Sequence, residues 1–333
     1  MEERGRGSED DEEKGMTVVT PRLPDRRMKE IFGEDVFTGS FFVNEAMKGH
    51  TTLRIGGPAD IYVMPANMHS LKHLFVALQD EAFPSTPVGG GSNLLVSDEG
   101  MTGAVISTGF LNHIETIKES ADEVSLFVEA GTALQKLVNL AKARGYSGIE
   151  GLSGIPGLLG GALRGNAGSF GYEIGGVVES VTIIDISGRV FSLDRDRMGF
   201  GYRRAAIPAG AIILSAHVKL RRDDPQEVAR RAGEFLQEKV RKQPVSQHSA
   251  GCVFGNPPGG HAGRLIDQAG CKGMRRGDVE VSPLHANFFV NRAEGKASDF
   301  LGLLDEVRER VMKSFGVELK PEIRIVGRFG SEQ

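Results

Sequence analysis

Apolar residues recur at helical spacing in several segments of the chain. The stripe in residues 132–145 is typical, because it ends at Gly145, a common stop signal for a helix. In residues 224–244 the stop signal is Pro244, which cannot continue a helix. The same spacing predicts helices over residues 68–81, 132–145, 224–244, 262–270 and 297–316.

Short runs rich in β-branched and aromatic residues lie between these helices and predict strands. Residues 52–65 are typical of two short strands around a Gly-Gly-Pro turn, and residues 177–194 of a hairpin. Residues 16–50 predict only a lead-in with a short helix. Because helices and strands alternate without a strict βαβ rhythm, we expect an α+β fold. Further strands are predicted within residues 87–100, 103–109, 113–120, 123–131, 210–222, 285–291 and 318–327.

The chain has 333 residues, more than one hydrophobic core usually serves. Its character changes near residue 223, where a polar amphipathic helix follows a series of strands. We therefore expect a disordered acidic leader, two subdomains that act together, and a separate α+β domain. The predicted boundaries are 1–30, 31–105, 106–222 and 223–333.

The formal net charge of −4 comes from the first fifteen residues, which hold seven acids and three bases. The rest of the chain is formally neutral and gives no electrostatic footprint for nucleic acid. No apolar run approaches the roughly 18 residues that a membrane span needs. The charged start is unlike a secretory signal, and the chain has two cysteines, so we expect a cytoplasmic protein with free thiols. The eight histidines and two cysteines show no metal-ligand spacing.

Glycine is about twice as frequent as usual, at 45 of 333 residues, and it is clustered. Residues 89–95 read GGGSNLL, and residues 151–176 hold ten glycines in 26 positions. Glycine lets backbone N–H groups approach an anion closely, and Ser and Asn add hydrogen-bond donors. Two such loops on different strands suit a long diphosphate cofactor between two subdomains. Tight turns and a loop-rich packing seam are the alternatives.

Eight motifs occur in an order that resembles one enzyme family. They are HTTLRIGGPAD (50–60), GGGSNLLVSDEG (89–100), GLSGIPGLLGGALRGNAGSFG (151–171), FGYR (200–203), QPVSQHSAGCVFGNP (243–257), AGRLIDQAG (262–270), HANFFVN (285–291) and PEIRIVG (321–327). Together they resemble the UDP-N-acetylenolpyruvoylglucosamine reductases, flavoenzymes of peptidoglycan precursor synthesis. The resemblance runs from about residue 35 to 328.

The resemblance implies that a two-subdomain module, similar to that of vanillyl-alcohol-oxidase-type flavoproteins, holds FAD non-covalently. NADPH would be the co-substrate, and the third domain would bind the small-molecule substrate, UDP-N-acetylglucosamine enolpyruvate. We expect a monomer with no nucleic-acid or membrane partner. The cofactor-binding residues implied are Ile55, Gly57, Gly89, Gly90, Gly91, Ser92, Asn93, Leu94, Ser153, Gly154, Ile155, Gly160, Gly161, Asn166, Ala167 and Gly168.

Three catalytic residues follow from the resemblance. The family's reaction passes a hydride from flavin N5 to C3 of the enolpyruvyl group and a proton to C2. Cys252 lies at the position of the proton donor, where many members have serine. Arg203 matches the catalytic arginine, since a guanidinium can hold a carboxylate with two hydrogen bonds. Glu322 matches the catalytic glutamate, and in neutral form it could donate a hydrogen bond to the developing enolate.

Tyr202, Asn256 and His285 are the substrate-side residues that the resemblance implies. The sequence departs from the family at Gly255, where lysine is common, and at Gly165, where a larger residue is usual. Arg204 follows Arg203 directly and competes with it for the catalytic role. Only a short segment separates Arg203 from the next strand, which resembles the shorter form of the family that lacks a tyrosine-bearing lid loop.

Two other functions remain open at this point. One is an oxidase of the vanillyl-alcohol-oxidase type, in which His50 would attach FAD covalently. The other is a nucleotide-sugar binder without activity. The departures from the family pattern at Gly165 and Gly255 are compatible with this alternative. Cys271 lacks partners such as those of Cys252, and we interpret it as structural.

Overall fold

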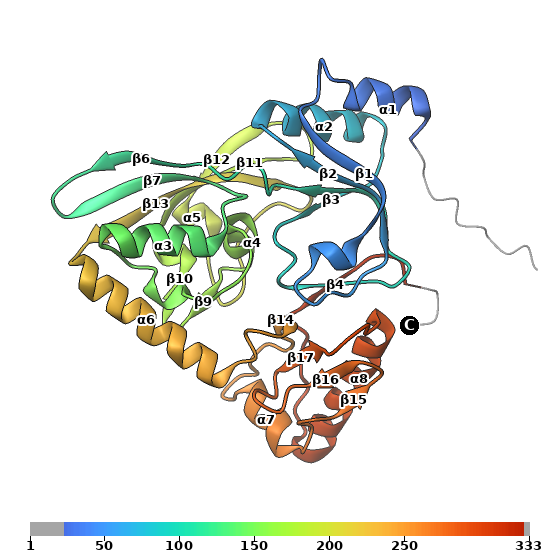
Figure 1. Ribbon diagram of the computed structural model, residues 1–333, viewed down its shortest axis with the longest axis vertical. Helices are drawn as coiled ribbons and strands as arrows, with labels where there is room; N and C mark the ends of the chain where they lie inside the picture. Colours follow the sequence, from blue (N-terminus) through green and yellow to red (C-terminus); the bar gives the residue numbers. More distant parts are fainter. Residues whose placement is uncertain (1–22, 330–333) are drawn as a thin grey trace, which may run out of the picture.

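The computed structural model describes residues 23–329 and contains three main sheets, each with its own helices (Figure 1). The first sheet has the strand order β1-β2-β5-β3, and β2, β5 and β3 run parallel. Helices α1 and α2 pack together beside it. We call this part of the chain the first unit; it contains α1 (Asp25–Phe32), β1 (Gly39–Ala46), the 3-10 helix η1 (Met47–His50), β2 (Pro58–Pro65), α2 (Met68–Asp80), β3 (Ser85–Val88), β4 (Leu94–Val96) and β5 (Met101–Ser107).

The second sheet is antiparallel, with the order β12-β11-β13-β7-β6, and β8 also pairs with β13. Helix α3 and the glycine-rich segment that follows it cover one face (Figure 1). The second unit contains β6 (Ile114–Glu119), β7 (Glu123–Glu129), α3 (Leu134–Arg144), β8 (Tyr146–Ser147), η2 (Glu150–Leu152), α4 (Leu159–Arg164), the separately paired β9 (Gly168–Ser169) and β10 (Tyr172–Glu173), η3 (Ile174–Gly176), β11 (Val178–Ile184), β12 (Val190–Asp194), α5 (Arg195–Met198) and β13 (Ile212–Arg222).

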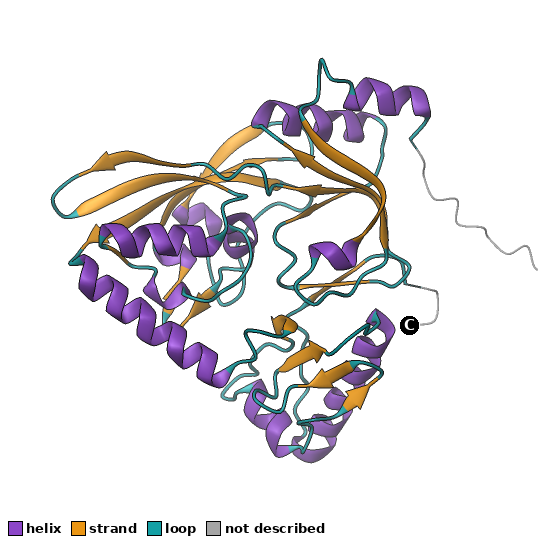
Figure 2. Cartoon of the chain, viewed as in Figure 1, coloured by secondary structure: helices purple, strands orange, loops and turns teal. Residues whose placement is uncertain are grey.

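The third sheet is small, with the order β14-β17-β16-β15, and α8 packs against it (Figure 2). The chain then returns to the first unit, where β18 pairs in parallel with β4. This return brings the segment before β18 beside the first glycine loop. The third unit contains β14 (His248–Cys252), α7 (Ala262–Gln268), β15 (Arg275–Arg276), β16 (Val279–Val281), β17 (Phe288–Asn291) and α8 (Ala297–Phe315); α6 (Pro225–Lys242) precedes it and β18 (Arg324–Val326) follows it.

Helix α6 packs against α3 and η2 of the second unit rather than against the third sheet. Its N-terminus is well defined, because Asp224 caps the N–H groups of Gln226 and Glu227 and Pro225 occupies the first turn. The predicted domain boundary at 223 stays a prediction, but these contacts favour a boundary after α6. Of the predicted leader, residues 1–22 lie outside the described residues, and the last residues belong to α1.

The predicted helices are all present, and two of the strand predictions need correction. Residues 52–57 form no strand, because the chain turns there: Thr51 Oγ1 donates to the carbonyl of Ile55, and Thr52 Oγ1 donates to the carbonyl of Ser249. Residues 39–46 form β1, an eight-residue strand where only a lead-in was predicted. The α+β class is confirmed. None of the helices within residues 23–329 is long and apolar enough to cross a membrane.

Candidate active site

Arg203 and Glu322 form an ion pair between the second unit and the segment that precedes β18. The Nε of Arg203 lies 2.8 Å from Oε1 of Glu322. The guanidinium also donates through Nη1 to the carbonyl of Gly168, 3.1 Å away, and lies over the ring of Tyr202. No ion pair connects Arg204 to Glu322 among the described residues. The geometry therefore favours Arg203 over Arg204 as the functional arginine.

The backbone at Arg203 is in the left-handed region, with φ +55°. Gly201 and Arg204 exchange backbone hydrogen bonds around it, so that the turn is closed on both sides. A non-glycine residue in this conformation costs about 1–3 kcal/mol unless its surroundings compensate. Here the turn directs the guanidinium toward Glu322, and strain of this kind is common at functional sites.

Glu322 is held by three backbone contacts. Its N–H donates to the carbonyl of Val253 at 2.7 Å, its carbonyl accepts from Nδ2 of Asn93 at 3.2 Å, and the neighbouring Pro321 bridges to Phe254. Burial raises the pKa of the Glu322 carboxyl, and Arg203 offsets part of this rise. The pKa of Glu322 therefore stays above its ordinary value even beside a cation.

Cys252 ends β14, and the carbonyl of the next residue, Val253, accepts from the N–H of Glu322. The register of β14 against β17 shifts between Ser249 and Cys252, and Gly251 has φ +77° at this point. Bulges of this kind re-aim the side chains next to them. Burial raises the pKa of the Cys252 thiol to about 11, and the negative charge of Glu322 adds to the rise, while Arg203 acts in the opposite direction. The thiol is therefore protonated at neutral pH.

Asn287 is a further site residue that the sequence did not single out, although it lies in the quoted HANFFVN motif. It is buried, and a hydrogen bond with its side chain lowers the pKa of Cys252. The same amide accepts from the N–H of Phe254 at 2.9 Å and donates to its carbonyl at 2.8 Å. It therefore fixes the strand that carries Cys252. The only indication in the sequence is that Asn287 is a polar residue between apolar ones in a predicted strand.

The two glycine loops touch each other. A Cβ on Gly90 would lie 2.8 Å from Cα of Gly157, and a Cβ on Gly157 would lie 2.5 Å from Oγ of Ser92. Real Cβ atoms do not approach so closely, so both positions require glycine. A Cβ on Gly89 would lie 3.6 Å from the backbone N of Gly161. Both loops therefore present their backbones along one seam between the first and second units.

The seam has two features that fit a bound diphosphate cofactor. A Cβ on Gly161 would meet nothing within 4 Å, so there is open space beside the N-terminal turn of α4. The hydroxyl of Ser153 is buried and has no hydrogen-bond partner. Buried polar atoms are nearly always satisfied, so this hydroxyl fits contact with a further molecule. The residues of the seam therefore fit FAD.

Three of the implied cofactor residues have structural tasks that the sequence did not reveal. Asn166 uses its whole amide inside the protein: Nδ2 donates to Glu173 and to the carbonyl of Gly201, and Oδ1 accepts from Gly175. Ile55 is buried in the core of the third unit. A Cβ on Gly57 would meet the carbonyl of Asp98. The side chains of Asn166 and Ile55 are thus used within the protein, and Gly57 allows a close approach of the backbone at Asp98.

The implied substrate residues are only partly near the ion pair. Tyr202 is exposed beside Arg203. Oδ1 of Asn256 accepts from the N–H of Ala262 at 3.0 Å and so caps the start of α7. His285 accepts at Nδ1 from the N–H of Asn287, and burial lowers its pKa. Its hydrogen bonds lie within its own loop, and the structure does not bring it into contact with Arg203 or Glu322.

The two departures from the family leave open space rather than a clash. A Cβ on Gly255 would lie 3.9 Å from Oε2 of Glu322, so a side chain there would extend beside the carboxyl. A Cβ on Gly165 would meet only the carbonyl of Gly161 at 3.6 Å. His50, the candidate for covalent attachment, hydrogen-bonds to Glu45 at 2.8 Å and stacks on Tyr62. Both cysteines are free, and Cys271 is buried in the core of the third unit.

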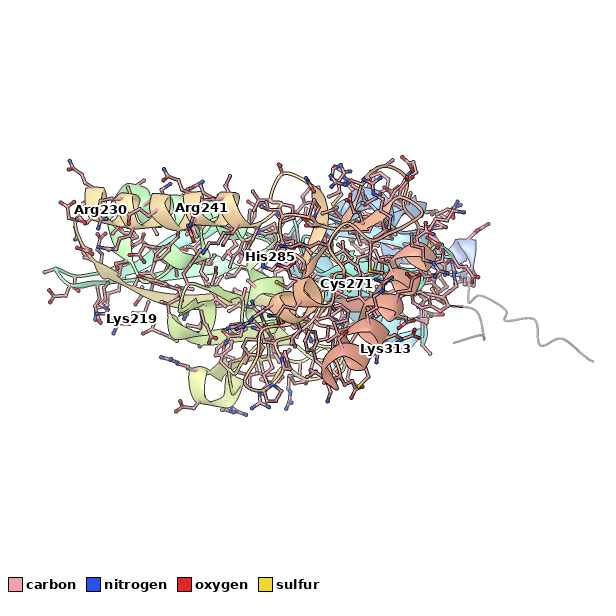
Figure 3. The ribbon with its side chains drawn as sticks, turned by 90° about the horizontal axis from the view of Figure 1, so that it is seen from below. Lys219, Arg230, Arg241, Cys271, His285 and Lys313 are labelled. Carbon is pink, nitrogen blue, oxygen red and sulfur yellow. The ribbon has the colours of Figure 1, made fainter. Side chains whose placement is uncertain are left out.

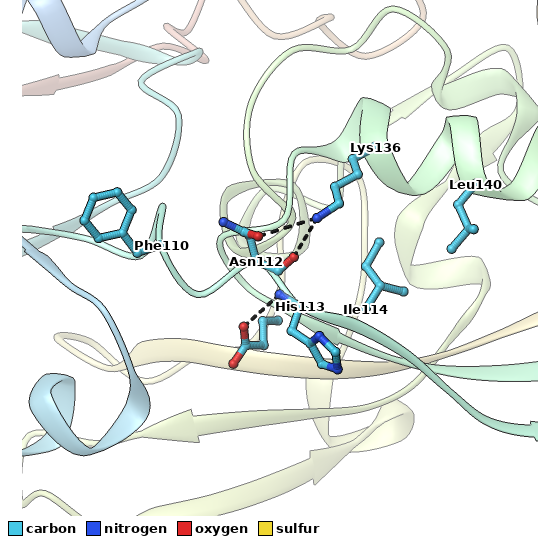
Figure 4. A pocket seen from close by; sticks show the side chains of 7 residues that line it. Phe110, Asn112, His113, Ile114, Lys136 and Leu140 are labelled. Atoms are coloured by element: carbon cyan, nitrogen blue, oxygen red, sulfur yellow. Dashed lines mark hydrogen bonds between the residues drawn. The ribbon is translucent and has the colours of Figure 1, made fainter. Parts of the chain in front are cut away.

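A separate open hollow of about 470 Å³ lies between the start of β6 and α3 (Figure 4). Lys136 donates there to the carbonyl and side chain of Asn112, and Glu129 accepts from the N–H of His113. None of the residues that line it is a candidate site residue. The hollow is lined by Phe110, Asn112, His113, Ile114, Glu129, Lys136 and Leu140.

Sequence profiles of two families match the chain. An FAD binding domain matches residues 59–194, and the C-terminal domain of UDP-N-acetylenolpyruvoylglucosamine reductase matches residues 243–326. The latter match begins just after α6, where the packing of that helix also favours a boundary.

Curated relatives match over nearly their whole length. A UDP-N-acetylenolpyruvoylglucosamine reductase from Caldanaerobacter subterraneus is 37% identical over 90% of this chain and 97% of its own. One from Geotalea uraniireducens is 39% identical over 87% of this chain and 95% of its own. The crystal structure of UDP-N-acetylenolpyruvylglucosamine reductase from Thermus caldophilus superimposes with a TM-score of 0.74. It has 35% identity and covers 87% of this chain and 99% of that one.

Proposed function

The chain belongs to the UDP-N-acetylenolpyruvoylglucosamine reductase family, and from this premise we propose the reaction and the residues that carry it. The protein is an FAD-dependent oxidoreductase. It reduces UDP-N-acetylglucosamine enolpyruvate to UDP-N-acetylmuramate in peptidoglycan precursor synthesis, with NADPH as the reductant. The observation that carries this proposal is the ion pair of Arg203 and Glu322 beside a protonated Cys252.

The seam between the two glycine loops would hold FAD, with backbone N–H groups of residues 89–93 and 160–161 near its diphosphate. Bound FAD supplies the hydride carrier between NADPH and C3 of the enolpyruvyl group. The open space at Gly161 and the unpaired hydroxyl of Ser153 support this placement. The short β9–β10 hairpin follows the second loop and reaches Arg203 through the carbonyl of Gly168.

Cys252 would donate the proton that C2 needs once C3 has been reduced. A pKa of about 11 keeps the thiol protonated at neutral pH, so the proton is available when the enolate forms. Arg203 lowers this pKa, and it would stabilise the thiolate that remains after the transfer. Burial and Glu322 thus keep the thiol protonated before the transfer, and Arg203 favours the thiolate that forms in the transfer.

Arg203 would bind the substrate carboxylate, since a guanidinium offers a planar pair of donors that matches it. Glu322 would act in its neutral form, because burial raises its pKa and a substrate carboxylate nearby would raise it further. The O–H of a neutral Glu322 can then donate a hydrogen bond to the oxygen on which enolate charge develops.

We also propose that the chain acts as a monomer in the cytoplasm on a small-molecule substrate. Two free thiols support a reducing compartment. In the proposed arrangement the glycine loops, Arg203, Glu322 and Cys252 all come from one chain, which supports a site that is complete in a monomer. We propose a first subdomain over residues 31–105, a second that starts at residue 106 and extends through α6, and a third domain that begins after α6 rather than at residue 223, because α6 packs against α3 and η2.

Two half-reactions test the proposal separately. The purified protein should be yellow, NADPH should bleach the flavin, and UDP-N-acetylglucosamine enolpyruvate should restore its colour in a stopped-flow experiment. Denaturation should release the flavin into solution. Flavin that stays on the denatured chain would instead support an oxidase with covalent FAD. Bleaching without reoxidation by the enolpyruvyl sugar would exclude the reductase activity.

A further inference from the structure

Lys239 is a buried lysine on α6 that the proposed reaction does not use. Its side chain is 3% exposed, and its Nζ donates to the carbonyl of Ser153 at 2.6 Å. No carboxylate of the described residues lies within ion-pair distance of this ammonium. Lysine is rarely buried without a partner, because removing an ammonium group from water is costly unless another group compensates its charge. Burial of the Lys239 ammonium therefore reduces the free energy of unfolding, and the charge is present despite this cost.

The contacts of Lys239 lie on the second glycine loop. A Cβ on Gly154 would lie 3.2 Å from Cδ of Lys239 and 2.9 Å from Cδ1 of Leu236. Gly154 has φ +75°, so it needs glycine both for its backbone conformation and for this close approach. Helix α6 therefore packs directly against residues 153–154. Gly157, three residues further along the same loop, lies against Ser92 of the first glycine loop.

The charged groups around Lys239 are otherwise engaged. Burial lowers the pKa of Lys239 to about 8, and the nearby charge of Arg203 contributes to this decrease. Arg203 itself is paired with Glu322, and on η2 the carboxylate of Glu150 is paired with Arg231. Glu238, on the same helix, binds Arg241 and Lys242. On the β9–β10 hairpin, Glu173 accepts from Asn166, and Phe170 turns its ring toward the ammonium at 5.7 Å.

We propose that Lys239 is a positioning residue for the cofactor: its ammonium holds the Ser153–Gly154 turn in the conformation that binds FAD, and loss of the charge releases it. The inference rests on the proposed function, since it assumes that this loop binds FAD. A charged donor makes a hydrogen bond to a carbonyl roughly twice as strong as a neutral one does. The hold of α6 on the loop therefore weakens when Lys239 loses its proton.

FAD binding to the apoprotein, followed by quenching of flavin fluorescence from pH 6.5 to 9.5, tests this inference. In the wild type the dissociation constant should rise at least tenfold as the pH passes about 8. Lys239→Met fills a similar volume without charge, so at pH 6.5 it should bind FAD at least tenfold more weakly than the wild type, and its dissociation constant should not change near pH 8. Lys239→Arg should recover most of the affinity and lose the change near pH 8, because an arginine stays charged.

Arg241→Met is the matched control. Arg241 lies on the outer face of the same helix, 71% exposed, and its guanidinium pairs with Glu238 (Figure 3). This variant should bind FAD with the affinity and pH dependence of the wild type. Should Lys239→Met fail to fold, the pH dependence of the wild type and of Lys239→Arg carries the test. Tight, pH-independent binding by Lys239→Met overturns the inference alone, whereas a wild type that binds no FAD at any pH overturns the proposed function as well.

Discussion

Arg203 and Glu322 lie 2.8 Å apart, nitrogen to oxygen, although one follows α5 and the other precedes the last strand. The pairing is possible because the chain returns from the third unit to pair β18 with β4. The relationship has a consequence for protonation. Arg203 lowers the pKa of Glu322, whose burial raises it, so any anion that takes the guanidinium should raise the pKa of Glu322 further.

Substrate binding should therefore be coupled to proton uptake. If the substrate carboxylate replaces Glu322 on Arg203, Glu322 loses the contact that favours its charged form and takes up a proton. Calorimetric titration of the oxidised enzyme in buffers of different ionisation enthalpy should show this uptake near pH 7. The Glu322→Gln variant should bind the substrate with no proton uptake. A wild type that binds without uptake would contradict the proposed state of Glu322.

Replacement of Cys252 should separate the two half-reactions. Cys252→Ala should leave bleaching of the flavin by NADPH unchanged and slow reoxidation by the enolpyruvyl sugar by about 10²–10⁴-fold, the usual contribution of a general acid. Cys252→Ser retains a hydroxyl proton and should keep substantial activity. Cys271→Ala, which removes the other thiol from the core of the third unit, is the control and should turn over normally. Normal turnover by Cys252→Ala would exclude the assignment.

The thiol of Cys252 should titrate well above an ordinary cysteine. Its pKa is raised to about 11 from 9, so the thiol is protonated in both the folded and unfolded chain below pH 9. The stability that this thiol contributes should be lost as the pH rises from 9 through 11. Thiolate absorbance of the Cys271→Ala protein should show a midpoint near pH 11. In a Glu322→Gln background the midpoint should fall but stay above 9, because burial is the larger cause.

The sequence predicts α2, α3, α7 and α8 well because the apolar stripe of each helix packs into a single hydrophobic core. It failed at β1, where Phe41, Phe42 and Val43 are all exposed, so the strand has no alternation of burial. What makes this segment a strand is its antiparallel pairing with β2, which lies later in the chain. Pairing partners cannot be recovered from local pattern alone.

The motifs indicate which residues to propose for the site, but they do not show how those residues lie relative to one another. The motifs name Arg203, Cys252 and Glu322, and the ion pair between the first and last of these depends on a long-range return of the chain. Asn287 was missed because a single polar residue in an apolar strand resembles any other. Asn166 was predicted to bind the cofactor, but its amide is used within the protein. The motif indicates that an asparagine is required at position 166, but it does not show whether the amide binds the cofactor or other residues of the protein.

Gly161 offers the sharpest test of the cofactor seam. A Cβ at this position would meet no atom of the described chain within 4 Å, so Gly161→Ala should fold as well as the wild type. If FAD lies against this backbone, the added methyl group should weaken FAD binding by tenfold or more, as measured by flavin fluorescence on the apoprotein. The thermal midpoint of the apoprotein should stay within a few degrees of the wild type.

Gly233→Ala is the matched control for this test. Gly233 lies in the middle of α6, and a Cβ there would also meet nothing within 4 Å. Alanine in a helix interior is favoured over glycine by about 0.5–1 kcal/mol, so this variant should be slightly more stable and bind FAD normally. Equal FAD affinity in both variants would mean that the cofactor does not contact Gly161. Weaker binding in Gly161→Ala alone, with both proteins folded, would place the cofactor along the seam of the two glycine loops.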